Sequence, residues 1–196
     1  MRSVSALVPH PGGKMEPMTA TLTSTGSTAA VIVTHQRAEL LRASLEQVVH
    51  QTHPVQWVIV VDNGAENAVR ELVESMAGDR GVYVPSETNL GGAGGFALGF
   101  LTALSLGADA VWCADDDGRP ADHTVLAELY RVAEANRLHE VSPAVCNIND
   151  PDQLAFPLRQ GLVWRRRMDE LEGDFLPGIA SLFNGALISA AAMEII

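Results

Sequence analysis

Three consecutive aspartates, Asp115, Asp116 and Asp117, are the residues of this chain whose types and spacing most clearly indicate chemistry. They follow the apolar run at residues 110–114, which predicts a buried strand. Adjacent carboxylates repel one another unless a cation or a raised pKa relieves the repulsion. Their oxygens are ligands that suit Mg²⁺ and Mn²⁺ better than softer metals. We expect Asp115 and Asp117 to share one side of the extended chain as metal ligands, with Asp116 directed elsewhere.

The same segment allows a structural alternative. Gly118, Arg119 and Pro120 follow the aspartates, and Asp122 then precedes a run with helical spacing, so one carboxylate could cap a helix N-terminus. A cap needs one carboxylate and gives no reason for three. We therefore interpret the trio as a ligand site and Asp122 as the capping residue.

A glycine-rich segment, residues 89–95, follows another short apolar run. Its glycines, Gly92, Gly94 and Gly95, let backbone amides approach a ligand, and a helix that starts there favours anions, although a tight turn would also use them. Gly92, Gly94 and Ala97 match the relaxed dinucleotide fingerprint G-x-G-x-x-A, so an NAD-dependent oxidoreductase is a rival. Against this rival, the segment follows the third predicted strand and not the first.

Polar residues also end the first two predicted strands. Asp62 would accept a hydrogen bond from a ribose hydroxyl or a base N–H, or else form a turn with Asn63 and Gly64. Arg37 would pair with a diphosphate or stack on a base, or else be a solvated arginine at a helix start.

A run of cations stands later in the chain. Arg165, Arg166 and Arg167 follow the largely apolar residues 156–164. Such a run is usually a solvated face. The alternative is contact with an anionic acceptor or, peripherally, with a membrane surface.

The elements that must position these residues follow a regular order. From residue 29 the chain alternates short β-branched runs with amphipathic helices, which is typical of α/β domains with a largely parallel sheet. Strands are predicted at residues 30–33, 57–61, 82–84, 110–114 and 141–145. Ligands of open α/β sheets bind beyond the carboxyl ends of strands, near the point where strand order reverses. We therefore expect the polar segments to meet at one edge of the sheet.

Composition limits the classes of function. A length of 196 residues suits one domain. The formal net charge of -11 argues against nucleic-acid binding, which requires clustered Lys and Arg. Cys113 and Cys146 form no CxxC, which argues against a zinc site or a disulfide framework. No window reaches the roughly 20 apolar residues of a membrane span, and no signal peptide is recognisable, so a cytoplasmic location is expected.

Together these features resemble the family-two glycosyltransferases of GT-A fold. The segments VIVTHQR, VVDNG, NLGGAGGFALGF, WCADDDGRP, VSPAVCNI, FPLRQGLVW and LPGIASLFNGALI are most similar to actinobacterial galactofuranosyltransferases that initiate the galactan of arabinogalactan. This resemblance covers residues 30–196. It implies a GT-A-type, Rossmann-like, mostly parallel sheet flanked by helices. It also implies metal-dependent inverting transfer from UDP-galactofuranose to a polyprenyl-diphosphate-linked rhamnosyl-GlcNAc primer, at the inner face of the plasma membrane.

Residue by residue, the resemblance places Thr34 and Arg37 near the uracil and diphosphate, and Asp62 and Asn89 at the uridine. The expected nucleotide-sugar site consists of Thr34, Arg37, Asp62, Asn89, Gly92, Gly94, Gly95, Asp115 and Asp116, and the Mn or Mg ligands are Asp115 and Asp117. Asn184 and Gly185 align with an acceptor-side Asn-Gly. Ala186 and Leu187 then stand where the polymerising relative has two tryptophans.

The domain boundaries complete this interpretation. Residues 1–28, rich in Pro, Gly, Ser and Thr, are predicted to be a disordered leader, and residues 29–196 the nucleotide-sugar-binding domain. The chain ends within an apolar helical pattern, so we expect this domain to be truncated before its acceptor-side part. The catalytic base is then expected beyond Ile196. Besides the oxidoreductase, the alternatives are a rhamnosyltransferase that uses dTDP-rhamnose and a non-catalytic nucleotide-binding module.

Overall fold

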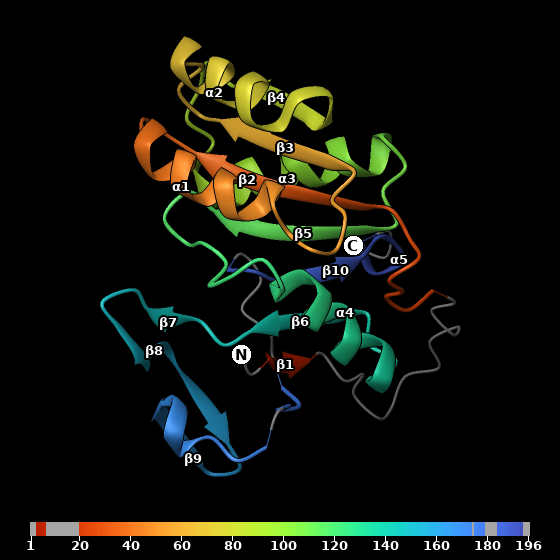
Figure 1. Cartoon of the computed structure of the whole chain (residues 1–196), viewed down its shortest axis with the longest axis vertical. Helices are drawn as coiled ribbons and strands as arrows, with labels where there is room; N and C mark the ends of the chain where they lie inside the picture. Colours follow the sequence, from red (N-terminus) through yellow and green to blue (C-terminus); the bar gives the residue numbers. More distant parts are fainter. Residues whose placement is uncertain (1–2, 7–19, 174, 179–183, 194–196) are drawn as a thin grey trace.

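A computed structural model describes residues 3–6, 20–173, 175–178 and 184–193. Figure 1 shows one large twisted sheet with helices on both faces and a smaller sheet beside it. The larger sheet has seven strands in the order β1-β6-β10-β5-β2-β3-β4, and the smaller has three in the order β7-β8-β9.

Parallel strands form the centre of the large sheet. They are β2 (Thr28–Thr34), β3 (Trp57–Asp62), β4 (Gly81–Pro85) and β5 (Ala110–Asp115). The other strands are β1 (Ser3–Ala6), β6 (Glu140–Pro143) and β10 (Leu187–Ser189). Because β10 runs antiparallel to both β5 and β6, β6 points the same way as the central strands. The predicted α/β architecture with a mostly parallel sheet is confirmed.

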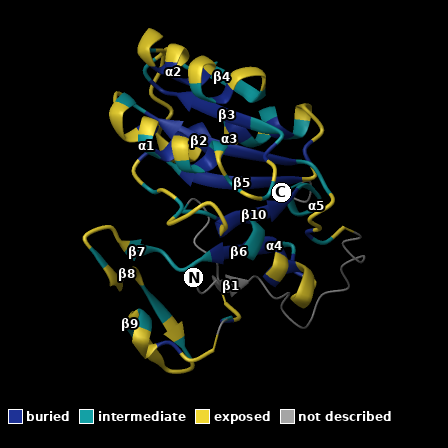
Figure 2. Cartoon of the chain, in the orientation of Figure 1, coloured by how far each residue is buried: buried dark blue, intermediate teal, exposed yellow. Residues whose placement is uncertain are grey.

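The helices cover both faces of this sheet, which explains why its central strands are continuous apolar runs. They are α1 (Ala38–Val49), α2 (Asn67–Ala77), α3 (Gly91–Ser105) and α4 (Val125–Asn136). Helices α1, α2 and α4 pack into one apolar cluster, and α3 packs into a second cluster on the opposite face. Every residue of β2 is buried, as Figure 2 shows.

The smaller sheet lies beside β6. It consists of β7 (Cys146–Asn147), β8 (Asp150–Gln160) and β9 (Val163–Arg167), which pair antiparallel. Short helices η1 (Gly78–Arg80), η2 (Met168–Glu170) and α5 (Ala190–Met193) complete the described elements. A minor apolar cluster of Leu154, Leu171 and Leu176 supports one face of this sheet. Within the described part of the chain, no helix is long and apolar enough to cross a bilayer.

The expectation of a disordered leader over residues 1–28 is corrected in part. Residues 3–6 form β1 at the edge of the sheet, and Thr28 begins β2. Leu22 is buried, and its backbone N–H donates to the Leu138 carbonyl over 2.9 Å. Composition misses such contacts because they depend on partners more than 100 residues away. Residues 7–19 lie outside the described part.

Candidate donor and metal site

Strand order reverses at β2, which lies between β3 and β5. The chain leaves β2 through α1 toward β3 and β4, and returns through α3 to β5 on the other side. In the parallel register Thr34 stands opposite Asp62, and Val33 stands opposite Asp115. The polar segments that follow β2, β3 and β5 therefore meet at one edge of the sheet, as predicted.

The three aspartates converge at this edge. One oxygen from each of Asp115, Asp116 and Asp117 lies within 4.8 Å of the others. The expectation that Asp116 would point away from its neighbours is therefore wrong. It assumed an extended chain, whereas β5 ends at Asp115 and the backbone bends there. Asp116 is buried, Asp115 half-buried and Asp117 exposed.

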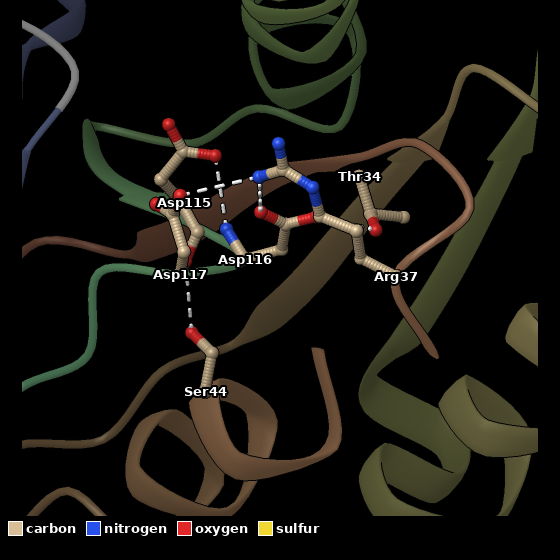
Figure 3. A network of polar contacts seen from close by, with 6 residues as sticks. All are labelled: Thr34, Arg37, Ser44, Asp115, Asp116 and Asp117. Carbon is tan, nitrogen blue, oxygen red and sulfur yellow. Dashed lines mark hydrogen bonds and ion pairs between the residues drawn. The ribbon is translucent and has the colours of Figure 1, made fainter. Parts of the chain in front are cut away.

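Asp116 is held by the segment that follows β2, as Figure 3 shows. The Thr34 hydroxyl donates to Asp116 Oδ2 over 2.9 Å, and the Arg37 guanidinium donates to Asp116 Oδ1 over 3.1 Å. The same Arg37 nitrogen lies 3.2 Å from Asp117 Oδ2. Attraction to Asp116, and then to Asp117, raises the pKa of Arg37. Arg37 thus supplies a resident positive charge at the acidic cluster, a pairing that sequence reasoning did not foresee.

The Asp115 carboxylate has fewer hydrogen-bond and ion-pair partners than that of Asp116. Its Oδ1 accepts from the Asp116 backbone N–H over 2.9 Å, and its carbonyl accepts from the Ser44 hydroxyl over 3.1 Å. Burial, with smaller contributions from the charges of Asp117 and Asp116, raises the pKa of this carboxyl. Figure 3 shows its carboxylate beside the Arg37 guanidinium, which partly opposes that rise.

These features fit a divalent cation. The donors are hard carboxylate oxygens from adjacent residues, of the type that Mg²⁺ and Mn²⁺ take. Three carboxylates face one arginine, so negative charge remains after the internal ion pairs. Bound cations are often the largest local charges in such sites and reverse the pKa shifts around them. The carboxylate oxygens of Asp115 and Asp117 make fewer contacts with protein side chains than those of Asp116.

Asp62 lies at the same edge but is fully buried. Its Oδ1 accepts from the Gly64 N–H over 2.9 Å, and its Oδ2 accepts from the Glu66 N–H and the Tyr83 hydroxyl over 2.6 and 2.9 Å. Burial, together with the bond to Asp62, raises the pKa of Tyr83 to about 12. These contacts correspond to the turn-forming alternative, and contact of Asp62 with uridine stays a prediction.

The glycine segment differs from the expected loop, because α3 already begins at Gly91. Gly91 has a φ of +67°, which favours glycine, and its N–H donates to Asn89 Oδ1 over 2.8 Å. Asn63 was expected only as part of a turn, yet its buried side-chain amide donates to the Gly91 carbonyl and accepts from the Leu90 N–H. Asn63 thereby joins the end of β3 to the start of α3.

The glycines of α3 have separate roles. A Cβ on Gly95 would lie 2.6 Å from Val33 Cγ1, and one on Gly94 would lie 2.8 Å from Leu90 Cβ. Gly95 therefore permits close packing of α3 on β2, and its contact with the nucleotide sugar stays a prediction. A Cβ on Gly92 would meet nothing within 4 Å, so packing does not explain this glycine.

Asp122 does not occupy the helix N-cap. Its Oδ1 accepts from the backbone N–H and the hydroxyl of Thr124, over 2.8 and 2.7 Å, and Thr124 is the residue before α4. The prediction that Asp122 caps the helix is therefore wrong, because the N-cap lies two residues later, at Thr124. Asp122 instead stabilises the turn that leads into α4. In the first turn of α4, the backbone N–H of Leu126 donates to the side-chain oxygen of Gln51 over 2.9 Å, so a residue outside the helix serves this N–H.

The acceptor-side pair predicted from the resemblance lies beside the acidic cluster. A Cβ on Gly118 would stand 3.8 Å from both Asn184 Oδ1 and Asp115 Cβ. Gly185 has a φ of +89°, and its carbonyl accepts from the Trp112 indole N–H over 3.1 Å. The segment before β10 therefore joins the site from a region distant in sequence.

Comparison with known proteins decides the family. Residues 29–189 match the family model of glycosyl transferase family 2. The chain belongs to glycosyl transferase family 2. Among family members, it is 56% identical over 180 residues to the galactofuranosyltransferase GlfT1 of Mycolicibacterium smegmatis. It is 54% identical over 178 residues to that of Mycobacterium tuberculosis. These matches cover 88% of this chain and 59% or 58% of the relatives, so the chain spans less than two thirds of their length.

Solved structures share the fold at low sequence identity. Residues 1–349 of TarS from S. aureus align with a TM-score of 0.62 and 14% identity, covering 86% of this chain and 48% of that one. The mannosyltransferase PcManGT from Pyrobaculum calidifontis, in complex with GDP-Man and Mn2+, aligns with a TM-score of 0.52 and 21% identity. This match covers 69% of this chain and 40% of that one. At these identities the likeness shows the fold alone.

Proposed function

We propose that this chain binds UDP-galactofuranose and transfers galactofuranose, with inversion, to a rhamnosyl-GlcNAc primer on polyprenyl diphosphate in cell-wall galactan synthesis. The observation that carries the proposal is the 54–56% identity to galactofuranosyltransferases over a segment that includes the acidic cluster. A cytoplasmic location at the inner face of the plasma membrane follows from such an acceptor and is part of the proposal.

In this proposal Asp115 and Asp117 hold Mn or Mg. When bound, that ion acts as a Lewis acid that neutralises charge on the departing UDP. Support for this role comes from the convergence of the three carboxylates and from a fold relative whose structure contains Mn2+. Asp116 positions Arg37 at the same edge, where the guanidinium would face the diphosphate of the donor.

Asn89, the N-terminus of α3 and Gly92 would approach the nucleotide and its diphosphate. Exposed amides at a helix N-terminus favour anions, and the open space beside Gly92 leaves room for a ligand. Asn184 and Gly185 would lie toward the acceptor, beside the acidic cluster.

The described carboxylates after Cys146 offer no convincing base. Glu170 accepts from the backbone N–H groups of Arg166 and Arg167, while Asp169 and Glu172 are exposed and pair with arginines of β9. We therefore propose that the residue that deprotonates the acceptor hydroxyl is not among the described carboxylates after Cys146.

The rival functions make different demands on the site. In the dinucleotide fingerprint, glycines form the turn after the first strand, whereas here Gly92 and Gly94 lie within α3, a helix that follows β4. A dTDP-rhamnose transferase would use the same edge, and the identity to galactofuranosyltransferases argues against it. A nucleotide-binding module without activity would bind donor but never transfer sugar.

Thermal-shift titrations with four ligands test the donor. With Mn present, UDP-galactofuranose and UDP should raise the melting temperature at lower concentrations than dTDP-rhamnose, and NADH should show no saturable effect, since only a ligand that binds the folded state stabilises it. Tighter binding of NADH than of UDP would overturn the transferase proposal. Preference for dTDP-rhamnose would leave the proposed metal role unchanged but would show that the donor sugar is rhamnose and not galactofuranose.

A further inference from the structure

The β8–β9 hairpin carries an exposed apolar tip that the donor site does not use. At the turn and in β9, Leu162 is 91% exposed, Trp164 61% and Val163 51%, and Phe156 within β8 is 50% exposed. Figure 1 shows the hairpin projecting away from the seven-stranded sheet, and Figure 2 shows much of it exposed. Exposed apolar residues gathered at one projecting tip indicate a contact surface, whereas single exposed apolar residues need no explanation.

Arginines surround this tip. Residues 153–168 contain four arginines and no acidic residue, in a chain with a formal net charge of -11. Arg159 is the register partner of Trp164, and Arg166 follows Trp164 by two residues, so the three side chains share one face of the hairpin. Within the described residues, neither Arg159 nor Arg166 makes an ion pair.

The opposite face of the hairpin is committed to the protein. Leu158 is the register partner of Arg165 and packs against the cluster of Leu154, Leu171 and Leu176. Arg165 lies 3.7 Å from Glu172, and Arg167 lies 3.5 to 3.9 Å from three aspartates at the base of the hairpin. The hairpin is thus anchored on one face and presents cations around an aromatic residue on the other.

We propose that this outer face and tip, formed by Arg159, Leu162, Trp164 and Arg166, dock the protein on an anionic phospholipid surface. Trp is favoured where apolar and aqueous phases meet, and arginines near such a surface attract anionic headgroups. Because the rest of the molecule is acidic, the same membrane repels it, and the hairpin alone sets the orientation. This proposal rests on the membrane location proposed above. Its residues are separate from the donor site, so membrane docking and donor binding can be tested, and refuted, independently.

Two other occupants fit less well. Pairing of a second copy along the free edge of β9 is disfavoured, because charged residues such as Arg165–Arg167 protect edge strands from further pairing. A solvated cationic face would account for the arginines but leaves the exposure of Leu162 and Trp164 unexplained.

Vesicle flotation tests the docking surface on the whole chain. Binding should require phosphatidylglycerol in phosphatidylcholine vesicles and weaken with salt. The pair Arg159→Gln and Arg166→Gln should weaken it roughly 30-fold, at about fivefold for each arginine. Leu162→Ser with Trp164→Ser should also weaken it. The matched controls Arg131→Gln on α4 and Leu101→Ser on α3, both exposed, should leave it unchanged.

Tryptophan fluorescence gives an independent measurement. Trp112 is buried and Trp57 partly buried, so a blue shift with anionic vesicles should come from Trp164 and be lost in Trp164→Phe. Equal binding to neutral vesicles, binding that survives the hairpin substitutions, or the absence of vesicle binding would overturn the proposal. Self-association of the protein that the hairpin substitutions abolish would also overturn the proposal, because it would show that a second copy binds this face.

Discussion

Asp116 and Asp115 are neighbours in sequence with opposite relations to the protein. Asp116 is buried and satisfied by Thr34 and Arg37, whereas Asp115 keeps a raised pKa because burial is only partly offset by hydrogen bonding. The site thus combines a carboxylate that joins two loops with others whose charge a ligand can use. A run of three aspartates in a sequence contains no sign of this division, since it depends on the position of Arg37.

Replacement of Asp117 by alanine tests the metal role. With the original residue, UDP should raise the melting temperature in Mn or Mg and lose that effect in EDTA, because a cation must stand between the diphosphate and the carboxylates. Asp117→Ala should abolish the metal dependence with little loss of stability, since its side chain is 57% exposed.

Asp122→Ala is the matched control. It removes the bonds to Thr124 and should lower the free energy of unfolding by about 1 kcal/mol, the typical net contribution of a hydrogen bond, while UDP binding stays metal-dependent. If UDP binding stays metal-dependent in Asp117→Ala but loses its metal dependence in Asp122→Ala, the metal is held by Asp122 and not by Asp117.

At the scale of elements, α3 and β2 approach closely because glycines line their contact. A Cβ on Gly99 would lie 2.3 Å from Val31 Cγ1. Gly99→Ala should therefore lower the free energy of unfolding by about 1–3 kcal/mol through overpacking, as measured by chemical denaturation. Gly92→Ala is the control, because its Cβ would meet nothing and alanine favours helix. Equal losses in the two variants would contradict this separation of roles.

Glu140 in β6 provides a pH-dependent test of the same sheet. It is 5% exposed, its Oε1 has no hydrogen-bond partner in the described part of the chain, and burial raises its pKa. A carboxyl with a raised folded pKa stabilises the fold below its unfolded pKa, and this contribution is lost as pH rises through the folded pKa. Glu140→Gln should therefore gain stability relative to the original chain as pH rises. Chemical denaturation at pH values from below the unfolded Glu pKa of about 4.3 upward measures this effect. If the two chains keep a constant difference in free energy of unfolding, the raised pKa of Glu140 is refuted.

The sequence was informative where the signal is local. The β-branched runs predicted four central strands, and the polar residues after them predicted the edge at which Thr34, Arg37 and Asp115 meet. Contacts set by distant register were missed. Strand β10 has three residues, and its place between β5 and β6 is decided by partners far away in the chain. The start of α3 at Gly91 and the bridging role of Asn63 likewise depend on packing that periodicity does not reveal.

At the scale of the whole molecule, the described edge supplies more residues for the proposed donor half of the site than for the proposed acceptor half. The proposed nucleotide side uses residues at the ends of β2, β3, β5 and the start of α3, whereas Asn184 and Gly185 are the residues expected to face the acceptor. The described carboxylates near the hairpin are committed to arginines or backbone N–H groups. Donor binding and sugar transfer should therefore separate experimentally in this chain.

The 196-residue chain should bind UDP with Mn yet transfer galactofuranose slowly compared with the longer Mycolicibacterium smegmatis relative, of which it spans 59%. Loss of a positioned base costs roughly 10²- to 10⁴-fold in rate, and loss of acceptor positioning adds to that deficit. Side-by-side assays with UDP-galactofuranose, Mn and a lipid-linked rhamnosyl acceptor measure the difference, and UDP-induced stabilisation verifies that both proteins bind donor. Turnover within about tenfold of the relative, well short of that loss, would place the base inside residues 1–196. Asp169, Glu170 and Glu172 would then be the first carboxylates to replace.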